Sequence, residues 1–174
     1  MRPRCSVFIA TSLDGFIARR DGGIDWLSIV ETPGEDYGYA SFFADVDALI
    51  LGRGTYDKVL TFPAWPYGDK RCVVLTHASY PSRHGERFHA GAPAPLLAEL
   101  QTAGVRRIYV DGGAVIRQFL RDGLIDDLTL SIVPIVLGEG IPLFDASVPT
   151  RRLRLAGSQA FPSGLVQLRY DVTG

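Results

Sequence analysis

Two short glycine-containing segments could bind phosphate. Residues 52–55 (Gly-Arg-Gly-Thr) and 112–116 (Gly-Gly-Ala-Val-Ile) each follow an apolar run and open a segment with helical character. Glycine lets the backbone approach a ligand closely, and a helix start offers free N–H groups and a positive dipole end. Arg53 adds a planar cation suited to phosphate. The alternative is a pair of ordinary strand–helix turns, with Thr55 as a helix cap.

The expected location of the two segments supports the phosphate-binding interpretation. Ligands of open parallel sheets bind at the carboxyl ends of the strands, where both segments are expected to lie. They are not the Rossmann fingerprint, which needs a third glycine and a later acidic residue. Leu75, Thr76 and His77 close another predicted strand. The side chains of Thr76 and His77 either reach a phosphate at the same sheet edge or form only a polar strand end.

Candidates for acid–base chemistry lie mainly in the first 36 residues. Ser12 and Asp14 follow the first predicted strand, where Asp14 precedes a glycine and is either a turn former or a catalytic group. Trp26 either lines a pocket or belongs to the core. The next carboxylates are Glu31, Glu35 and Asp36, for which helix-start or solvent positions are the alternative.

The whole chain sets limits on these chemistries. Its 174 residues, 47% hydrophobic and 21% charged, are expected to form a single domain over residues 1–174. A net charge of -1 argues against nucleic acid as a partner, since phosphate backbones need a basic surplus. No apolar run has the length of a membrane span and no segment resembles a signal peptide, so we expect a cytoplasmic protein. The two cysteines and three histidines have no metal-ligand spacing, so no metal site is expected.

Short apolar runs alternate with helical patterns along most of the chain. Strands are predicted at residues 5–11, 48–51, 71–76, 107–111 and 128–137, and helices at 36–44, 55–60, 95–103 and 114–121. The strand at 128–137 contains Pro134, which indicates an edge or a bulge. Residues 153–160 and 165–172 flank a tight turn and predict an antiparallel hairpin. The pattern is typical of an α/β fold with a mostly parallel, helix-covered sheet.

Taken together, these segments resemble the dihydrofolate-reductase-like superfamily. The closer similarity is to the branch that contains the C-terminal reductase domain of bacterial riboflavin biosynthesis enzymes. The matching pieces cover nearly the whole chain: SLDGFIA, GIDWL, DYGYASFF, ADVDALILGRGTY, VVLTH, IYVDGGAVIRQFLRDGLIDDLTLSIVPIVLGEGIPLF and the final hairpin. The resemblance implies a three-layer fold whose mixed, mostly parallel sheet has about eight strands, a C-terminal antiparallel hairpin and helices on both faces.

The resemblance also implies NADPH as cofactor and a homodimer as the assembly. Carried over by position, Ala10 and Ile17 flank the nicotinamide. The phosphates and the adenosine side fall to Arg53, Gly54, Thr55, Leu75, Thr76 and His77, and the pyrophosphate to Gly112, Gly113, Ala114, Val115 and Ile116.

The implied reaction is hydride transfer from NADPH to a C=N or C=O bond of a small heterocyclic or sugar-derived substrate, as in 5-amino-6-(5-phosphoribosylamino)uracil reductase. The substrate-binding candidates are Ser12, Asp14 and Trp26, and the catalytic candidates are Asp14 first and Glu31 second. Dihydrofolate reduction is one alternative. A non-catalytic nucleotide- or ligand-binding protein of the same fold is the other.

Overall fold

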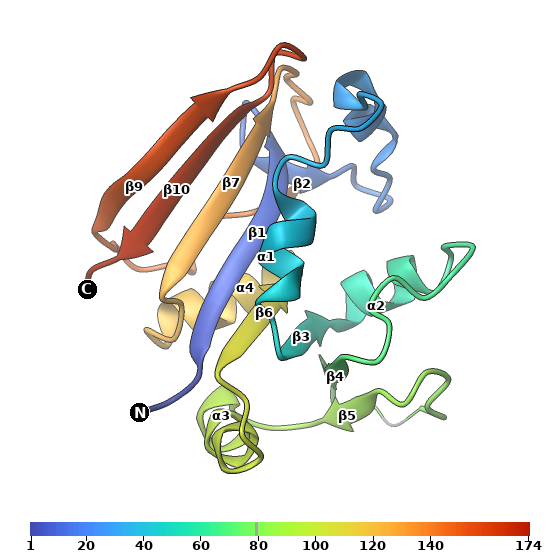
Figure 1. Cartoon of the computed structure of the whole chain (residues 1–174), viewed down its shortest axis with the longest axis vertical. Coiled ribbons are helices and arrows are strands. Elements are labelled where there is room, and N and C mark those ends of the chain that lie inside the picture. Colours follow the sequence, from blue (N-terminus) through green and yellow to red (C-terminus); the bar gives the residue numbers. More distant parts are fainter. Residues whose placement is uncertain (79) are drawn as a thin grey trace.

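A mixed sheet of eight strands, in the order β5-β4-β3-β6-β1-β7-β10-β9, forms the centre of the molecule (Figure 1). The computed structural model describes residues 1–78 and 80–174. Six neighbouring strands run parallel: β1 (Arg4–Ser12), β3 (Ala48–Gly52), β4 (Arg71–Leu75), β5 (Arg87–His89), β6 (Arg107–Asp111) and β7 (Asp127–Val133). The hairpin of β9 (Leu153–Ala160) and β10 (Val166–Val172) joins β7 in antiparallel fashion. A small second sheet pairs β2 (Phe16–Ala18) with β8 (Ile141–Pro142).

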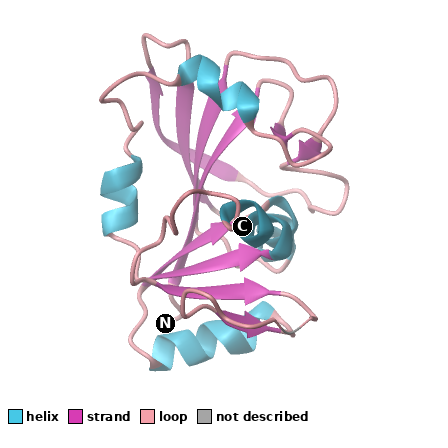
Figure 2. Cartoon of the chain, turned by 90° about the vertical axis from the view of Figure 1, so that its right-hand side faces the viewer, coloured by secondary structure: helices cyan, strands magenta, loops and turns pink. Residues whose placement is uncertain are grey.

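Helices cover both faces of the large sheet, because alternate strand residues are apolar on each face (Figure 2). Buried residues of α3 (Pro93–Thr102) and α4 (Gly113–Arg121) pack with Val7, Ile50 and Val110 on one face. On the other face, α1 (Tyr39–Ala44) and α2 (Arg53–Val59) pack over Leu49 and Tyr109. A 3-10 helix, η1 (Asp25–Val30), lies beyond β1. No helix within the described ranges is long and apolar enough to span a bilayer.

The predicted fold class is confirmed: the sheet is mixed and mostly parallel, carries the C-terminal hairpin and has helices on both faces. Two predicted elements were wrong in extent. The strand expected over residues 128–137 ends at Val133, because Pro134 has no N–H for a further ladder bond. The helix expected over residues 36–44 starts only at Tyr39, because Tyr37 and Gly38 have positive φ angles of 55° and 83°.

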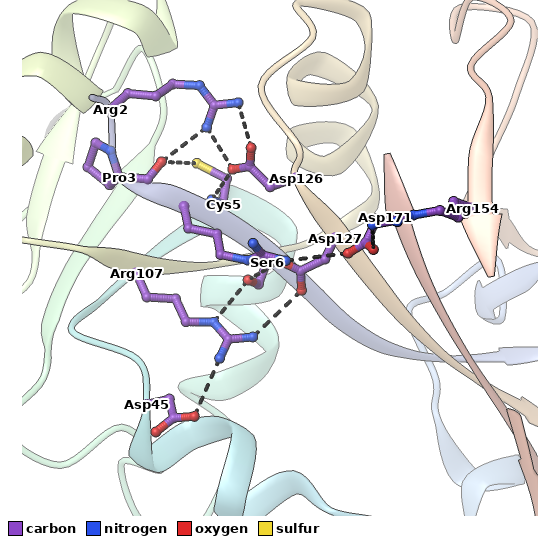
Figure 3. Close-up of polar contacts among 11 residues, drawn as sticks. Arg2, Pro3, Cys5, Ser6, Asp45, Arg107, Asp126, Asp127, Arg154 and Asp171 are labelled. Atoms are coloured by element: carbon purple, nitrogen blue, oxygen red, sulfur yellow. Dashed lines mark hydrogen bonds and ion pairs between the residues drawn. The ribbon is translucent and has the colours of Figure 1, made fainter. Parts of the chain in front are cut away.

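A network of ion pairs joins β1, β6 and β7 at the amino end of the parallel strands (Figure 3). Asp127, whose side chain is 13% exposed, accepts hydrogen bonds from Arg4 Nε at 2.7 Å and from Ser6 Oγ at 2.8 Å. The buried Ser6 hydroxyl in turn accepts one from Arg107 Nε at 3.0 Å. The neighbouring Asp126 accepts the N–H of Cys5 at 2.7 Å. The network fixes the register of β1 against both neighbours, at the end of the sheet away from the glycine turns.

We expect Asp127→Ala to lower the free energy of unfolding by about 1–3 kcal/mol, because it leaves the buried Ser6 hydroxyl without its acceptor and removes the ion pairs with Arg4 and Arg107. Urea unfolding monitored by circular dichroism measures the change. The control is Glu139→Gln, which removes a surface pair with Arg20 at 3.0 Å and is expected to cost less than about 1 kcal/mol. Equal losses in the two variants would show that the Asp127 network adds nothing specific.

Candidate functional site

A cavity of about 710 Å³ lies on the α1 face of the sheet, against β1 and β7. Its floor includes Phe8 and Ala10 of β1 and Val133 of β7, while Tyr39 of α1 and Tyr109 of β6 form part of its wall. The lining is mainly apolar and aromatic with a few polar groups. Such composition is typical of small-molecule sites in enzymes. Ala10, predicted to flank a nicotinamide, is therefore exposed to this space.

The two glycine turns lie directly against each other. Leu51 at the end of β3 pairs with Asp111 at the end of β6, so α2 and α4 begin side by side. A Cβ on Gly112, whose φ is 104°, would lie 2.6 Å from Thr55 Oγ1. A Cβ on Gly52 would lie 3.1 Å from Val115 Cγ2. Glycine at these positions lets two helix starts converge, which concentrates free N–H groups and positive dipole ends at one place.

Gly54 has no comparable packing reason. It lies in the first turn of α2 at an ordinary negative φ, and a Cβ built on it would meet no atom within 4 Å. Glycine inside a helix costs about 0.5–1 kcal/mol relative to alanine, so an unneeded glycine here is unfavourable for the fold alone. The open space outside Gly54 instead fits a ligand that approaches the backbone closely. The residues present therefore fit a phosphate-bearing cofactor.

The predicted adenosine-side residues cluster next to this turn. Leu75 pairs with Gly52 across β3 and β4, so Thr76 and the exposed His77 follow beside the start of α2. The Arg53 guanidinium lies 3.7 Å from the centre of the Tyr80 ring, and its Nε donates to Asp57 at 2.7 Å. These contacts orient Arg53, while the Asp57 charge offsets part of its attraction for phosphate.

Ile17 lies at the other side of the turn. A Cβ on Gly113 would lie 2.9 Å from Ile17 Cδ1 and 3.4 Å from the Pro142 carbonyl oxygen. The small sheet of β2 and β8 therefore rests on the start of α4. Arg117 of α4 holds this arrangement by donating to the Pro142 carbonyl and by pairing with Asp145 at 3.0 Å. The structure thus places Ile17 against Gly113 at the start of α4, and its contact with a nicotinamide stays a prediction.

The Asp14 carboxylate joins two loops through hydrogen bonds. Its carboxylate accepts hydrogen bonds from Ser12 Oγ at 2.6 Å, from the Leu137 N–H at 3.1 Å and from the Gly138 N–H at 2.7 Å. The Ser12 hydroxyl, together with these backbone N–H groups, holds the pKa of Asp14 below its ordinary value. Ser12 is buried, also accepts the Phe16 N–H, and is fully used by the turn. Neither residue lines the cavity, so a role in binding or chemistry stays a prediction for both.

Trp26 is 2% exposed and packs with Val30, Val133 and Leu165 in a core cluster next to Ala10. Its Nε1 is buried without a hydrogen-bond partner among the described residues. Burial of an unpaired donor is costly, so a ligand or a water molecule would be favoured there. The structure places Trp26 behind the cavity wall, and its predicted contact with substrate remains untested.

Three carboxylates, Glu31, Glu35 and Asp36, lie at the rim of the cavity. Two of them have local structural partners. Glu35 accepts the N–H of Tyr37 at 2.7 Å, and Asp36 accepts those of Gly38 and Ala40, each at 2.9 Å. The carboxylate of Glu31, at the end of η1, has no hydrogen-bond or ionic partner in the described part of the chain. Of the predicted catalytic residues, only Glu31 therefore borders the cavity.

Asp111 was not among the acids predicted from the sequence. It ends β6, and its carboxylate accepts the Gly112 N–H at 2.9 Å. Burial raises the pKa of Asp111 to about 6, against the opposing effect of that hydrogen bond. Burial, with a contribution from the Asp111 charge, also raises the pKa of Tyr39 to about 12 and the pKa of Tyr109 well above its usual range. The available signal was one acidic residue closing an otherwise buried strand directly before the glycine turn.

Comparison with known proteins identifies the family. The family model of the RibD C-terminal domain matches residues 60–167. The chain belongs to the RibD C-terminal domain family. This RibD C-terminal domain is 42% identical to the uncharacterized protein YwjB of Bacillus subtilis (strain 168), with 98% of each chain covered. It is 33% identical to the riboflavin biosynthesis protein RibD of Corynebacterium ammoniagenes, covering 80% of this chain and 45% of that protein.

The fold of the chain also matches a solved structure. A solved structure from Shewanella sp. PV-4, provisionally assigned to riboflavin biosynthesis, superposes with a TM-score of 0.91 at 35% identity over the full length of both chains. The predicted membership of the dihydrofolate-reductase-like superfamily is therefore confirmed, together with the riboflavin-type branch.

Proposed function

We propose that this RibD C-terminal domain is an NADPH-dependent reductase that transfers a hydride to a C=N or C=O bond of a small heterocyclic or sugar-derived compound. The observation that carries the proposal is the direct contact of the two glycine turns at the carboxyl ends of β3 and β6, on the same sheet as a cavity lined by Ala10. The similarity to RibD of Corynebacterium ammoniagenes supports a reductase of the riboflavin type.

The cofactor-binding residues follow from the placement of the turns. Gly54, Thr55 and Arg53 would hold phosphate at the start of α2, and Gly112–Ile116 would hold it at the start of α4. Thr76 and His77 would lie toward the adenosine, with Ala10 and Ile17 toward the nicotinamide. When bound, NADPH supplies the hydride, while the protein supplies orientation and charge.

The chain itself would supply the proton that accompanies reduction. Asp111 has the properties of a general acid, because burial raises its pKa to about 6, near the working pH, whereas the pKa of Asp14 is lowered. Tyr39 and Tyr109 stay protonated and line the cavity. The Tyr109 hydroxyl donates to the Phe8 carbonyl at 3.0 Å, so Tyr39 presents the hydroxyl donor toward the cavity. The apolar floor excludes water and strengthens these interactions. Asp111 does not itself line the cavity, whereas its neighbour Tyr39 does. We therefore propose Asp111 as the proton donor, with the Tyr39 hydroxyl passing the proton to the substrate.

Titration of the protein with NADPH tests the cofactor. Nicotinamide fluorescence should rise with saturable binding, and Arg53→Ala should raise the Kd for NADPH about tenfold or more through loss of a phosphate contact. Asp57→Asn is the matched variant, since it frees the Arg53 guanidinium and should leave the affinity equal or higher. Absence of binding at millimolar NADPH would refute the proposed function.

Asp14→Asn should lower kcat about tenfold with the Kd for NADPH nearly unchanged, because an amide cannot accept as strongly from Ser12 and the loop N–H groups. The reason is loss of the link between the β1 turn and residues 137–138. Stopped-flow NADPH oxidation and fluorescence titration measure the two quantities. A kcat equal to that of the wild type would rule out even a positioning role.

Dihydrofolate reduction is a second candidate, favoured by one observation: Glu31 ends the tryptophan-bearing η1 helix and borders the cavity. Turnover of dihydrofolate with NADPH tests it, and no turnover at high enzyme concentration removes it. A binding protein without chemistry would still bind NADPH. In a substrate screen, no carbonyl or imine compound would cause it to oxidise the bound NADPH.

From the family resemblance, we also propose that the protein is a homodimer and that it is located in the cytoplasm. Light scattering of the purified protein tests the dimer.

A further inference from the structure

We infer that the substrate of this cavity is an uncharged or cationic compound that carries no phosphate group. The inference rests on the proposed reductase function and specifies its substrate class. It separates this chain from a reductase of 5-amino-6-(5-phosphoribosylamino)uracil, whose substrate is a phosphate ester.

The side chains around the cavity have a negative balance. Among its sixteen described lining residues, three are carboxylates, Glu31, Glu35 and Asp36, and none is a lysine, arginine or histidine. The other polar groups are uncharged, chiefly the hydroxyls of tyrosines and of Ser131. Proteins bind phosphate with guanidinium, ammonium or clustered N–H groups. A phosphate placed here would meet like charges instead, which costs affinity at short range.

The helix start nearest the cavity is already occupied by an internal anion. The Asp36 carboxylate accepts the N–H groups of Gly38 and Ala40 at the beginning of α1. These N–H groups lower the pKa of Asp36, so the carboxylate is charged at neutral pH and stays on them. The backbone donors that could have bound a substrate phosphate are therefore used by the protein itself.

Glu31 is the carboxylate best placed to favour a cationic substrate over an anionic one. It has no partner among the described residues, and it borders both the main cavity and an adjoining one of about 390 Å³. Lys58 lines the smaller cavity, and Asp25 there is paired with Arg19 at 2.7 Å, so the negative balance belongs to the main cavity. A cationic or N–H-bearing group would find an acceptor in Glu31, while an anionic group in the main cavity would find no ammonium, guanidinium or imidazole group among the lining residues.

A matched pair of compounds tests the inference on the NADPH-bound protein. The pair is 5-amino-6-(5-phosphoribosylamino)uracil and the same compound without its phosphate. We expect kcat/KM to be at least about tenfold higher for the dephosphorylated compound, as like-charge repulsion at this distance predicts. A higher kcat/KM for the phosphorylated compound would overturn the inference and leave the reductase proposal intact.

A binding arm keeps the test independent of turnover. Benzamidine, benzamide and phenyl phosphate share a ring and differ in charge, and calorimetry measures their affinity for the protein with and without NADP⁺. Benzamidine should bind at least about tenfold more tightly than phenyl phosphate, and Glu31→Lys should reverse the order. Asp122→Lys, the same change at the exposed C-terminal cap of α4, should leave the order as it is. Tighter binding of phenyl phosphate than of benzamidine to the wild type would overturn the inference. If the protein prefers benzamidine but does not bind NADP⁺, only the reductase proposal is overturned.

Discussion

Asp111→Asn is expected to lower kcat about 100-fold or more and, at the same time, to make the folded protein more stable at neutral pH. Burial raises the pKa of Asp111 to about 6, so the wild type holds a protonated acid there below that pH. An amide keeps an acceptor for the Gly112 N–H but cannot donate a proton to a substrate. Catalysis and stability should therefore change in opposite directions.

The pH dependence follows from the direction of the shift. The pKa of Asp111 is raised from 3.8 to about 6, so the folded state binds more protons than the unfolded state between these values. The wild type therefore loses stability as pH rises through this window, relative to the asparagine variant, by about 3 kcal/mol at pH 7. Likewise, kcat should fall as pH rises above about 6, because the acid form of Asp111 is lost.

Urea unfolding at pH 4 and pH 7 and NADPH oxidation across pH 5–8 measure these effects, with Asp122→Asn as the matched control on the exposed end of α4. The control should change neither quantity. A variant that loses stability and keeps its kcat would contradict both parts of the prediction, and the proton donor would then be sought at Glu31.

Gly54→Ala should weaken NADPH binding about tenfold while raising thermal stability. A methyl group at residue 54 meets no protein atom within 4 Å, so the fold has room for it. Alanine is favoured over glycine inside a helix by about 0.5–1 kcal/mol. The same methyl group would project into the space where a phosphate is proposed to approach the start of α2. Calorimetric titration and differential scanning calorimetry measure the two effects.

Gly54→Asp extends the test. A carboxylate in the first turn of α2 is favourable for the helix dipole but repels a phosphate, so the loss of affinity should exceed that of alanine while the fold is kept. An unchanged Kd for NADPH in both variants would show that phosphate does not bind at this helix, even if the protein binds the cofactor elsewhere.

Most of the fold could be predicted because its signals are local. The buried strand at residues 107–111 and the hairpin at residues 153–172 follow directly from hydrophobic runs and turn residues. The glycine turns were also visible, but their mutual contact depends on the sheet order, which places β3 next to β6. Sequence spacing alone carries no such information, since these turns are separated by about sixty residues of chain.

The chemistry of individual carboxylates was less predictable because it depends on burial and partners. Asp14 precedes a glycine in a turn, and only the structure shows that residues 137 and 138 complete its hydrogen bonds. Asp36 looked like a helix-start residue, which is its role at α1. Asp111 closes a buried strand directly before a glycine turn, but its raised pKa arises from burial in the folded sheet, which that sequence position does not reveal by itself.

The ion-pair network around Asp127 lies at the amino end of the parallel strands, whereas the glycine turns and the cavity border their carboxyl ends. Damage at the amino end should therefore reduce how many molecules fold and leave each folded molecule with an unaltered affinity and turnover. In a screen of random variants, substitutions near Asp127 should thus reduce protein yield at constant specific activity. For the same reason, this end of the molecule is the suitable place to attach a surface linker or a fluorescent label.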